Sequence, residues 1–135
     1  MNAYTQSNAY QAYQNAANHG RVAASNPHGL ILMLMDGAIE RIARARGCIE
    51  NKDFASKAHL LHRSVAIIDE LRNSLDRKNG GPLADNLHEL YDYMCRELLQ
   101  GTVDNKVDRL DGVLNLLRQV RDAWIVIPKL QGAGR

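Results

Sequence analysis

Histidine and carboxylate side chains are the first residues to test for chemistry, because helical proteins use them to hold metal ions. His59 and His62 lie three residues apart, which places two imidazoles on one face of a helix. Ferritin-like sites take Glu-x-x-His motifs from two helices, and the sequence contains no such motif. We interpret both histidines, together with His28 and His88, as residues on the polar flanks of helices, and we predict no metal and no other cofactor.

Cys48 and Cys95 are the candidate nucleophiles. A catalytic thiol needs an activating base and an oxyanion site, whereas these two lie beside apolar helical stripes and are interpreted as small, partly buried side chains. The sequence also lacks a P-loop, a G-x-G-x-x-G motif and a G-x-S-x-G motif. We therefore predict that the protein is not an enzyme. Two isolated cysteines match no disulfide framework, which favours a reducing compartment, the cytoplasm.

Arginines gather at Arg41, Arg44 and Arg46, but the net charge of the chain is only +2. A nucleic-acid-binding stripe needs a larger and more one-sided excess of positive charge. We predict that no nucleic acid is bound and that these arginines form a solvated face. The acidic residues of the 80–101 segment are a candidate complement to them.

The elements that position these residues follow from length and periodicity. With 135 residues, 45% of them apolar, the chain is expected to form one core. No apolar run reaches the roughly 18 residues of a membrane span, and the polar start differs from a signal peptide, so we predict no membrane insertion.

Apolar residues recur at helical spacing from Ser25 onward. Four helices are expected, at about 26–50, 54–79, 83–101 and 104–128. Ser25 or Asn26 is the expected N-cap of the first, with Pro27 in its first turn, and Asp53 is the expected N-cap of the second. Gly101 is the expected left-handed residue that ends the third helix, and the fourth is expected to close near Pro128.

Long helices joined by short connections predict an all-α fold, an antiparallel up-down four-helix bundle. We divide the chain into an N-terminal arm or short extra helix at 1–24, the bundle at 25–128 and a flexible tail at 129–135.

Six consecutive apolar residues, from Leu30 to Met35, are the main anomaly. At about 100° per residue they pass around the whole helix, so one core cannot bury them all. A contiguous exposed apolar patch usually marks an interface. The cover is expected to be the N-terminal arm, a partner helix or a second copy of the chain.

The arm has the composition of a removable cover. Tyr4, Tyr10 and Tyr13 lie in a polar stretch without Lys, Arg, Asp or Glu before Arg21. Tyrosine offers apolar area with a hydrogen-bonding tip, which suits reversible docking into an apolar groove.

At these residues the chain resembles the FliS family of flagellin export chaperones. Residues 25–38 are similar to the family's entry into its first long helix, A-S-P-x-x-L-I-x-M-L-Y-D-G-A. Leu75-Asp76 with Gly80-Gly81, the L-Y-D-Y-M of residues 90–94, and the closing Ala123-Trp124 also match family motifs. The pairs around Tyr10 and Tyr13 resemble its N-terminal tyrosine motif. The resemblance extends over almost the whole predicted bundle.

The resemblance implies a cytoplasmic chaperone that binds the C-terminal segment of monomeric flagellin and prevents premature polymerisation. It further implies delivery to the membrane protein of the flagellar type III export gate and, in some relatives, binding of the flagellar anti-sigma factor. The expected partner-binding residues are Tyr10, Tyr13, Leu30, Ile31, Met33, Leu34, Gly37 and Tyr91.

A second interpretation of the same apolar excess is a structural helical bundle, a homo-oligomer or adaptor without flagellin specificity. Whether the chain is a monomer or a homodimer stays open from the residues alone.

Overall fold

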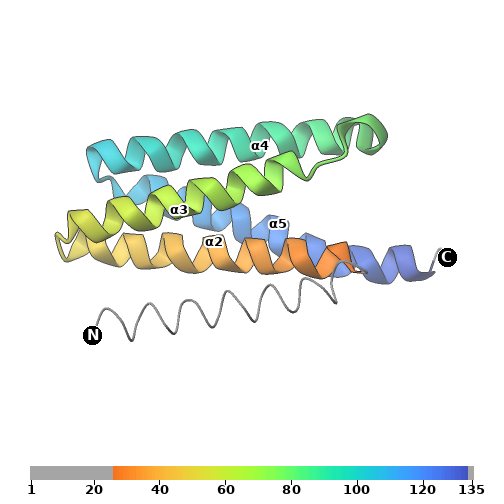
Figure 1. Ribbon diagram of the computed structural model, residues 1–135, viewed down its shortest axis with the longest axis horizontal. Helices are drawn as coiled ribbons and strands as arrows, with labels where there is room; N and C mark the ends of the chain where they lie inside the picture. Colours follow the sequence, from red (N-terminus) through yellow and green to blue (C-terminus); the bar gives the residue numbers. More distant parts are fainter. Residues whose placement is uncertain (1–25, 134–135) are drawn as a thin grey trace.

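The computed structural model describes the backbone of residues 26–133 and the side chains of residues 26–127. This part of the chain forms four α-helices and contains no strand. The helices are α2 (Pro27–Glu50), α3 (Phe54–Asn73), α4 (Arg77–Asp104) and α5 (Val107–Ala133), and they lie side by side in alternating directions (Figure 1). The predicted all-α bundle is confirmed. The predicted arm at 1–24 lies outside the described residues.

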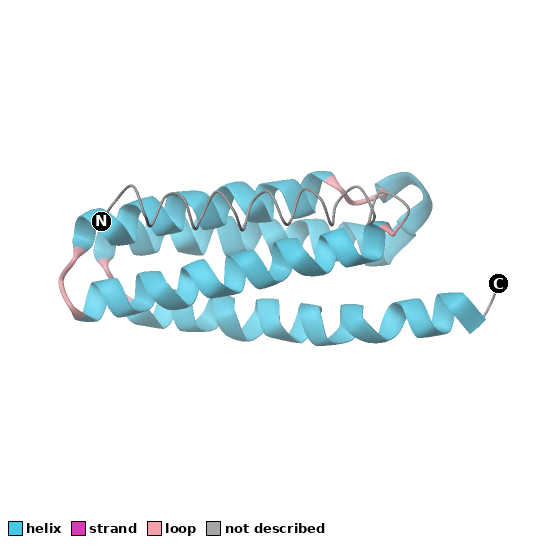
Figure 2. Cartoon of the chain, turned by 60° about the horizontal axis from the view of Figure 1, so that its bottom comes forward, coloured by secondary structure: helices cyan, strands magenta, loops and turns pink. Residues whose placement is uncertain are grey.

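The helices pack as a ring in which α2 and α4 each contact both α3 and α5. Short loops join them at both ends (Figure 2). The centre of the bundle is filled by side chains from all four helices that are 1% exposed or less, among them Met35, Ile42, Leu61, Met94 and Leu110. Because every helix buries an apolar stripe against its neighbours, the fold needs no metal or disulfide to hold it together.

Two helix starts confirm the predicted caps. The Asn26 side chain accepts a hydrogen bond from the Gly29 backbone N–H at 3.4 Å, and Asp53 accepts one from the Ser56 N–H at 3.3 Å. Each satisfies a backbone donor that a helix start leaves without an internal partner. Pro27, which has no N–H to satisfy, occupies the first turn of α2 as expected.

The boundary between the second and third helices was predicted wrongly. Helix α3 ends at Asn73, well before the glycine pair, and α4 begins at Arg77. Asp76 is the cause, since its carboxylate accepts from the Asn79 backbone N–H at 3.1 Å and starts a new turn. Gly81 then breaks this turn from the rest of α4, with φ 57° and ψ −143°, a conformation open to glycine alone.

The predicted end of the third helix is also wrong. Gly101 is helical and buried, and a Cβ at this position would lie 2.8 Å from Leu110 Cδ1, so the glycine permits close contact with α5. The left-handed residue is instead Asn105, with φ 57°. The prediction that the fourth helix closes near Pro128 is likewise wrong, because α5 continues to Ala133.

Lys57 links the start of α3 to the end of α4 through hydrogen bonds. Its side chain is only 4% exposed. The Nζ group donates to the Thr102 carbonyl at 2.8 Å and to Asn105 Oδ1 at 2.6 Å, and it lies 5.3 Å from the centre of the Phe54 ring. A buried cation at a helix C-terminus is stabilised by the free carbonyls and by the helix dipole.

The surface charges pair differently from the sequence expectation. Arg46 donates to Asp111 on α5 at 2.6 Å and pairs with Glu50 on its own helix at 3.0 Å. It does not pair with the acidic residues of α4, which instead face other cations: Asp92 pairs with Arg72, and Glu97 pairs with Arg109. No helix in the described part of the chain is long and apolar enough to cross a membrane.

Candidate functional site

An apolar groove opens at the end of the bundle where α2 begins. Two adjoining cavities of about 390 and 730 Å³ form it, and they share Leu30, Ile31 and Ser74 in their walls. The walls come from the first turns of α2, the end of α3, the turns of α4 on both sides of Gly81, and Trp124 of α5. We call this surface the end groove. Its size lies within the usual range of binding pockets.

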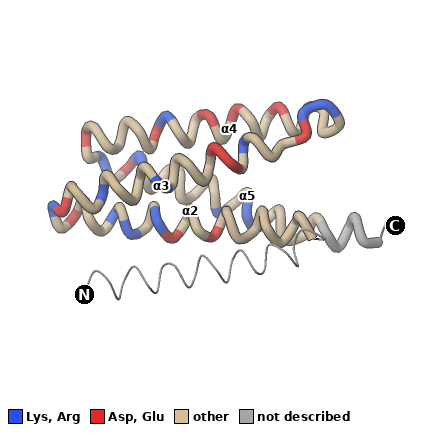
Figure 3. Tube along the Cα trace, in the orientation of Figure 1, with Lys and Arg blue, Asp and Glu red and all other residues tan. Residues whose placement is uncertain are grey.

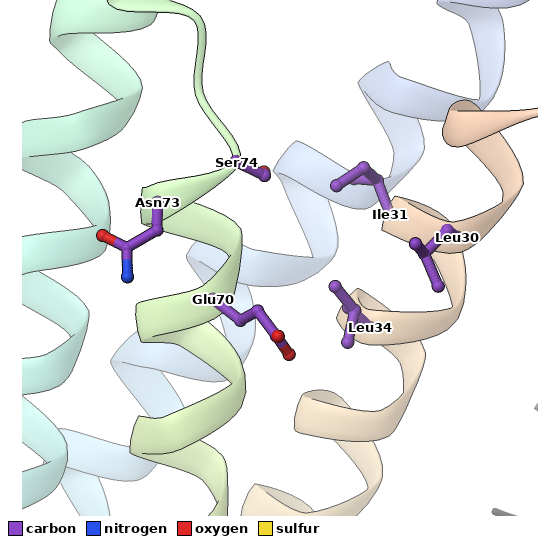
Figure 4. Close-up of a pocket in the computed structure, with 6 residues that line it drawn as sticks. All are labelled: Leu30, Ile31, Leu34, Glu70, Asn73 and Ser74. Carbon is purple, nitrogen blue, oxygen red and sulfur yellow. The ribbon is translucent and has the colours of Figure 1, made fainter. Parts of the chain in front are cut away.

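The smaller cavity lies between α2 and α3. Leu30, Ile31 and Leu34 form its α2 wall, and Glu70 reaches toward Leu34 from α3 (Figure 4). Leu30 is 39% exposed, whereas Ile31 and Leu34 are half-buried and also pack against the core. Three of the predicted partner-binding residues therefore lie together on one wall.

Tyr91 is the fourth predicted partner-binding residue that lies at the end groove. It belongs to α4 and lines the larger cavity, although its side chain is only 2% exposed. Burial raises the pKa of its hydroxyl to about 12, so the group stays protonated at neutral pH.

Other predicted site residues lie elsewhere. Met33 is half-buried but lines neither cavity. Gly37 lies at the contact between α2 and α3, where a Cβ would come within 3.2 Å of Arg41 Nη1 and 3.8 Å of Ile67 Cδ1. The 3.8 Å approach to α3 is an ordinary van der Waals contact, so the packing of the two helices does not require glycine at this position. Tyr10 and Tyr13 lie outside the described residues.

His28 and Trp124 form a wall that the sequence interpretation missed. The two rings stack with centroids 4.9 Å apart and planes 5° apart. His28 Nε2 donates to the Trp124 carbonyl at 2.5 Å, and Trp124 Nε1 donates to the His28 carbonyl at 3.0 Å. The interpretation of His28 as an isolated residue on a polar flank is therefore wrong, because its partner lies far away in the sequence.

The His28 hydrogen bond explains how α5 continues past Pro128. In a regular helix the Trp124 carbonyl accepts from the backbone N–H four residues later, and proline has no N–H. The His28 imidazole donates to this carbonyl instead. The start of α2 and the last turns of α5 are thus held together beside the end groove.

Charge is unevenly distributed around the end groove, because Glu70 and Asp76 line it from the side of α3 and α4 whereas the start of α2 is uncharged. The cap Asn26 and the first nine residues of helix α2, Pro27–Met35, contain no Lys, Arg, Asp or Glu, and Figure 3 shows the corresponding uncharged stretch of the tube. Within residues 26–133 no group of three or more His, Cys, Asp or Glu side chains is placed to hold a metal ion. The groove is built to bury apolar groups, with a few polar atoms in its walls.

The model of the family described as "Flagellar protein FliS" matches residues 6–131 of this chain. The chain belongs to the FliS family. This confirms the resemblance carried by the first helix entry and the L-Y-D-Y-M stretch. The relatives of the chain are named secretion chaperones, a class of binding protein, which confirms the prediction that it is not an enzyme.

Two relatives have similar sequences over almost their full lengths. Flagellar secretion chaperone FliSB of Pseudomonas aeruginosa is 40% identical over 116 residues, which cover 86% of this chain and 92% of the relative. Flagellar secretion chaperone FliS of Salmonella typhimurium is 40% identical over 115 residues, which cover 84% and 85% of the two chains.

A solved structure has the same fold. It is titled "Crystal structure of flagellar chaperone from bacteria" and superposes with a TM-score of 0.73 over 89% of this chain and 97% of that chain. Its sequence is 20% identical, so this likeness supports the four-helix architecture alone.

Proposed function

We propose that this FliS-family chain is a cytoplasmic export chaperone that binds the C-terminal segment of monomeric flagellin in the end groove. The observation that carries the proposal is an apolar groove in a chain of this family, lined by Leu30, Ile31, Leu34 and Tyr91. A client segment that is disordered alone and folds on binding buries its apolar face there. Binding then prevents premature polymerisation.

The ordering of the client limits affinity. A segment that folds on binding loses conformational entropy, and this loss offsets part of the free energy gained from apolar burial. Such a complex can release its client. We propose that release occurs at the membrane protein of the export gate. Binding of the anti-sigma factor rests on the family resemblance alone.

The N-terminal arm is the proposed cover of the empty groove. It joins the described part of the chain at Asn26, which itself lines the larger cavity. The stretch between Tyr13 and Asn26 spans up to about 43 Å when extended, so either Tyr10 or Tyr13 can reach the groove. The arm would leave when the client docks.

Leu30→Asp tests the groove assignment. It places a charge in the wall of both cavities, and the residue is already 39% exposed, so the bundle is expected to fold. Leu34 is a poorer probe because it also packs against the core. We expect Leu30→Asp to weaken binding of a flagellin C-terminal peptide by at least tenfold in titration calorimetry.

Leu99→Asp is the matched control. Leu99 is 52% exposed on α4 and lines neither cavity, so this variant should bind like the natural chain. Equal affinities for Leu30→Asp and Leu99→Asp would sink the groove assignment. Absence of any binding by the unchanged protein would sink the proposed function itself. Sedimentation of the same samples tests the structural-oligomer interpretation, which requires a dimer that survives added peptide.

A further inference from the structure

The hydroxyl of Tyr91 is a polar group in the wall of the end groove. The side chain is 2% exposed and lines the larger cavity of the end groove. Its hydroxyl makes no hydrogen bond to another residue in the range 26–127, and no side-chain N or O atom in that range is both fully buried and without a partner. The two residues that neighbour it along that wall, Leu87 and Ala84, offer no polar side-chain atom.

The other polar side chains of this cavity are already engaged. Asn26 accepts from the Gly29 N–H, Ser74 Oγ donates to the Leu71 carbonyl, and Asp76 accepts from Asn79. His28 and Trp124 bond to each other's carbonyls. Two lining side chains keep a donor with no bond to another described residue, the amide Nδ2 of exposed Asn26 and the hydroxyl of Tyr91, and Tyr91 is the one that lies deep in the cavity wall.

We propose that the Tyr91 hydroxyl donates a hydrogen bond to a main-chain carbonyl of the flagellin segment that docks in the end groove. This inference rests on the proposed function and names a residue that would fix the position of the client along the groove. Burial of apolar surface against the groove walls is not directional, whereas one hydrogen bond selects one register of the client.

A main-chain carbonyl is the acceptor that the cavity chemistry favours. Aliphatic side chains that fill an apolar cavity contain no hydrogen-bond acceptor. The main chain of the same residues does contain one, the backbone carbonyl. A segment that folds into helices leaves its last four carbonyls without an internal partner. A carbonyl buried unpaired is destabilising, so a donor in the cavity wall favours a helix end at that place.

Tyr91→Phe removes the hydroxyl and keeps the ring. We expect it to weaken binding of a flagellin C-terminal peptide by roughly three- to tenfold in titration calorimetry, the value of one neutral hydrogen bond. Tyr93→Phe is the matched control on the same helix, since Tyr93 is 43% exposed and lines neither cavity. Its affinity should equal that of the natural chain.

Stability of the free protein separates binding from a structural role. Because the hydroxyl has no partner among the described residues, Tyr91→Phe should leave the urea midpoint of the free protein unchanged or slightly raised. A loss of stability together with unchanged affinity would overturn the proposal, because it would show that the hydroxyl acts within the bundle.

Peptides with single amide-to-ester replacements identify the acceptor, because an ester carbonyl accepts a weaker hydrogen bond. We expect one replacement whose cost in affinity disappears in Tyr91→Phe. If no position couples to Tyr91, the main-chain assignment is wrong. If the natural chain binds the peptide and Tyr91→Phe binds equally well, this inference fails while the proposed function stands. If the natural chain does not bind, the proposed function fails first.

Discussion

The hydrogen bond from His28 to the Trp124 carbonyl predicts a specific coupling between His28 and Pro128. His28→Phe keeps an aromatic ring for the stack on Trp124 and removes the N–H that donates at 2.5 Å. The Trp124 carbonyl then has no donor, because Pro128 cannot supply one. A net loss of about 1 kcal/mol in the free energy of unfolding follows for one neutral hydrogen bond at a partly buried site.

Pro128→Ala restores the missing backbone N–H in the position where a helix normally uses it. In that background the Trp124 carbonyl accepts from the backbone N–H of residue 128 and not from the His28 imidazole. His28→Phe should then leave the free energy of unfolding almost unchanged. The double-mutant cycle therefore predicts a coupling of about 1 kcal/mol between two residues on different helices.

Urea denaturation of the four proteins measures this coupling, with Trp124 fluorescence and far-ultraviolet circular dichroism as the two probes. His62→Phe, an exposed histidine on α3, is the control for the change of residue type and should show no coupling to Pro128→Ala. The reasoning is refuted if His28→Phe costs the same free energy with proline and with alanine at position 128.

Two further predictions concern the rest of the bundle. Lys57→Met removes the hydrogen bonds to Thr102 and Asn105 and should lower the free energy of unfolding, measured in urea, by about 2 kcal/mol. Lys78→Met, at an exposed position, should change it little, and equal effects of the two substitutions would contradict a stabilising role of the Lys57 hydrogen bonds. Burial raises the pKa of the Cys95 thiol, so iodoacetamide at pH 8 should modify Cys48 before Cys95. Mass spectrometry follows the two alkylation rates, and equal rates would contradict this prediction.

Features set by neighbours in the sequence were predictable. Asn26 and Asp53 cap helices through bonds to residues three positions later, and the apolar stripe through Ile42 follows from the helical period. These interactions depend on local geometry, which composition and spacing specify directly.

Features set by tertiary contact were not predictable. Glycine often ends a helix, and the sequence therefore predicts that role for Gly101, whereas in the structure Gly101 is helical and makes room for Leu110. The role of His28 depends on Trp124, which only the folded bundle brings beside it. No spacing in the sequence indicates that Gly101 contacts Leu110 or that His28 contacts Trp124. The Ala123-Trp124 motif did single out Trp124, but without its partner.

The wrongly predicted end of α3 and the existence of the end groove have the same cause. Helices α2 and α3 are antiparallel neighbours, so the residues after Asn73 come level with the start of α2, where Ser74 lines the groove with Leu30. A helix that continued to residue 79 would add about 9 Å along α2 at this point. The Asp76 cap instead turns the chain into α4. Because α3 ends at Asn73, no further turn of α3 lies over the start of α2, and Leu30 is 39% exposed in the groove wall.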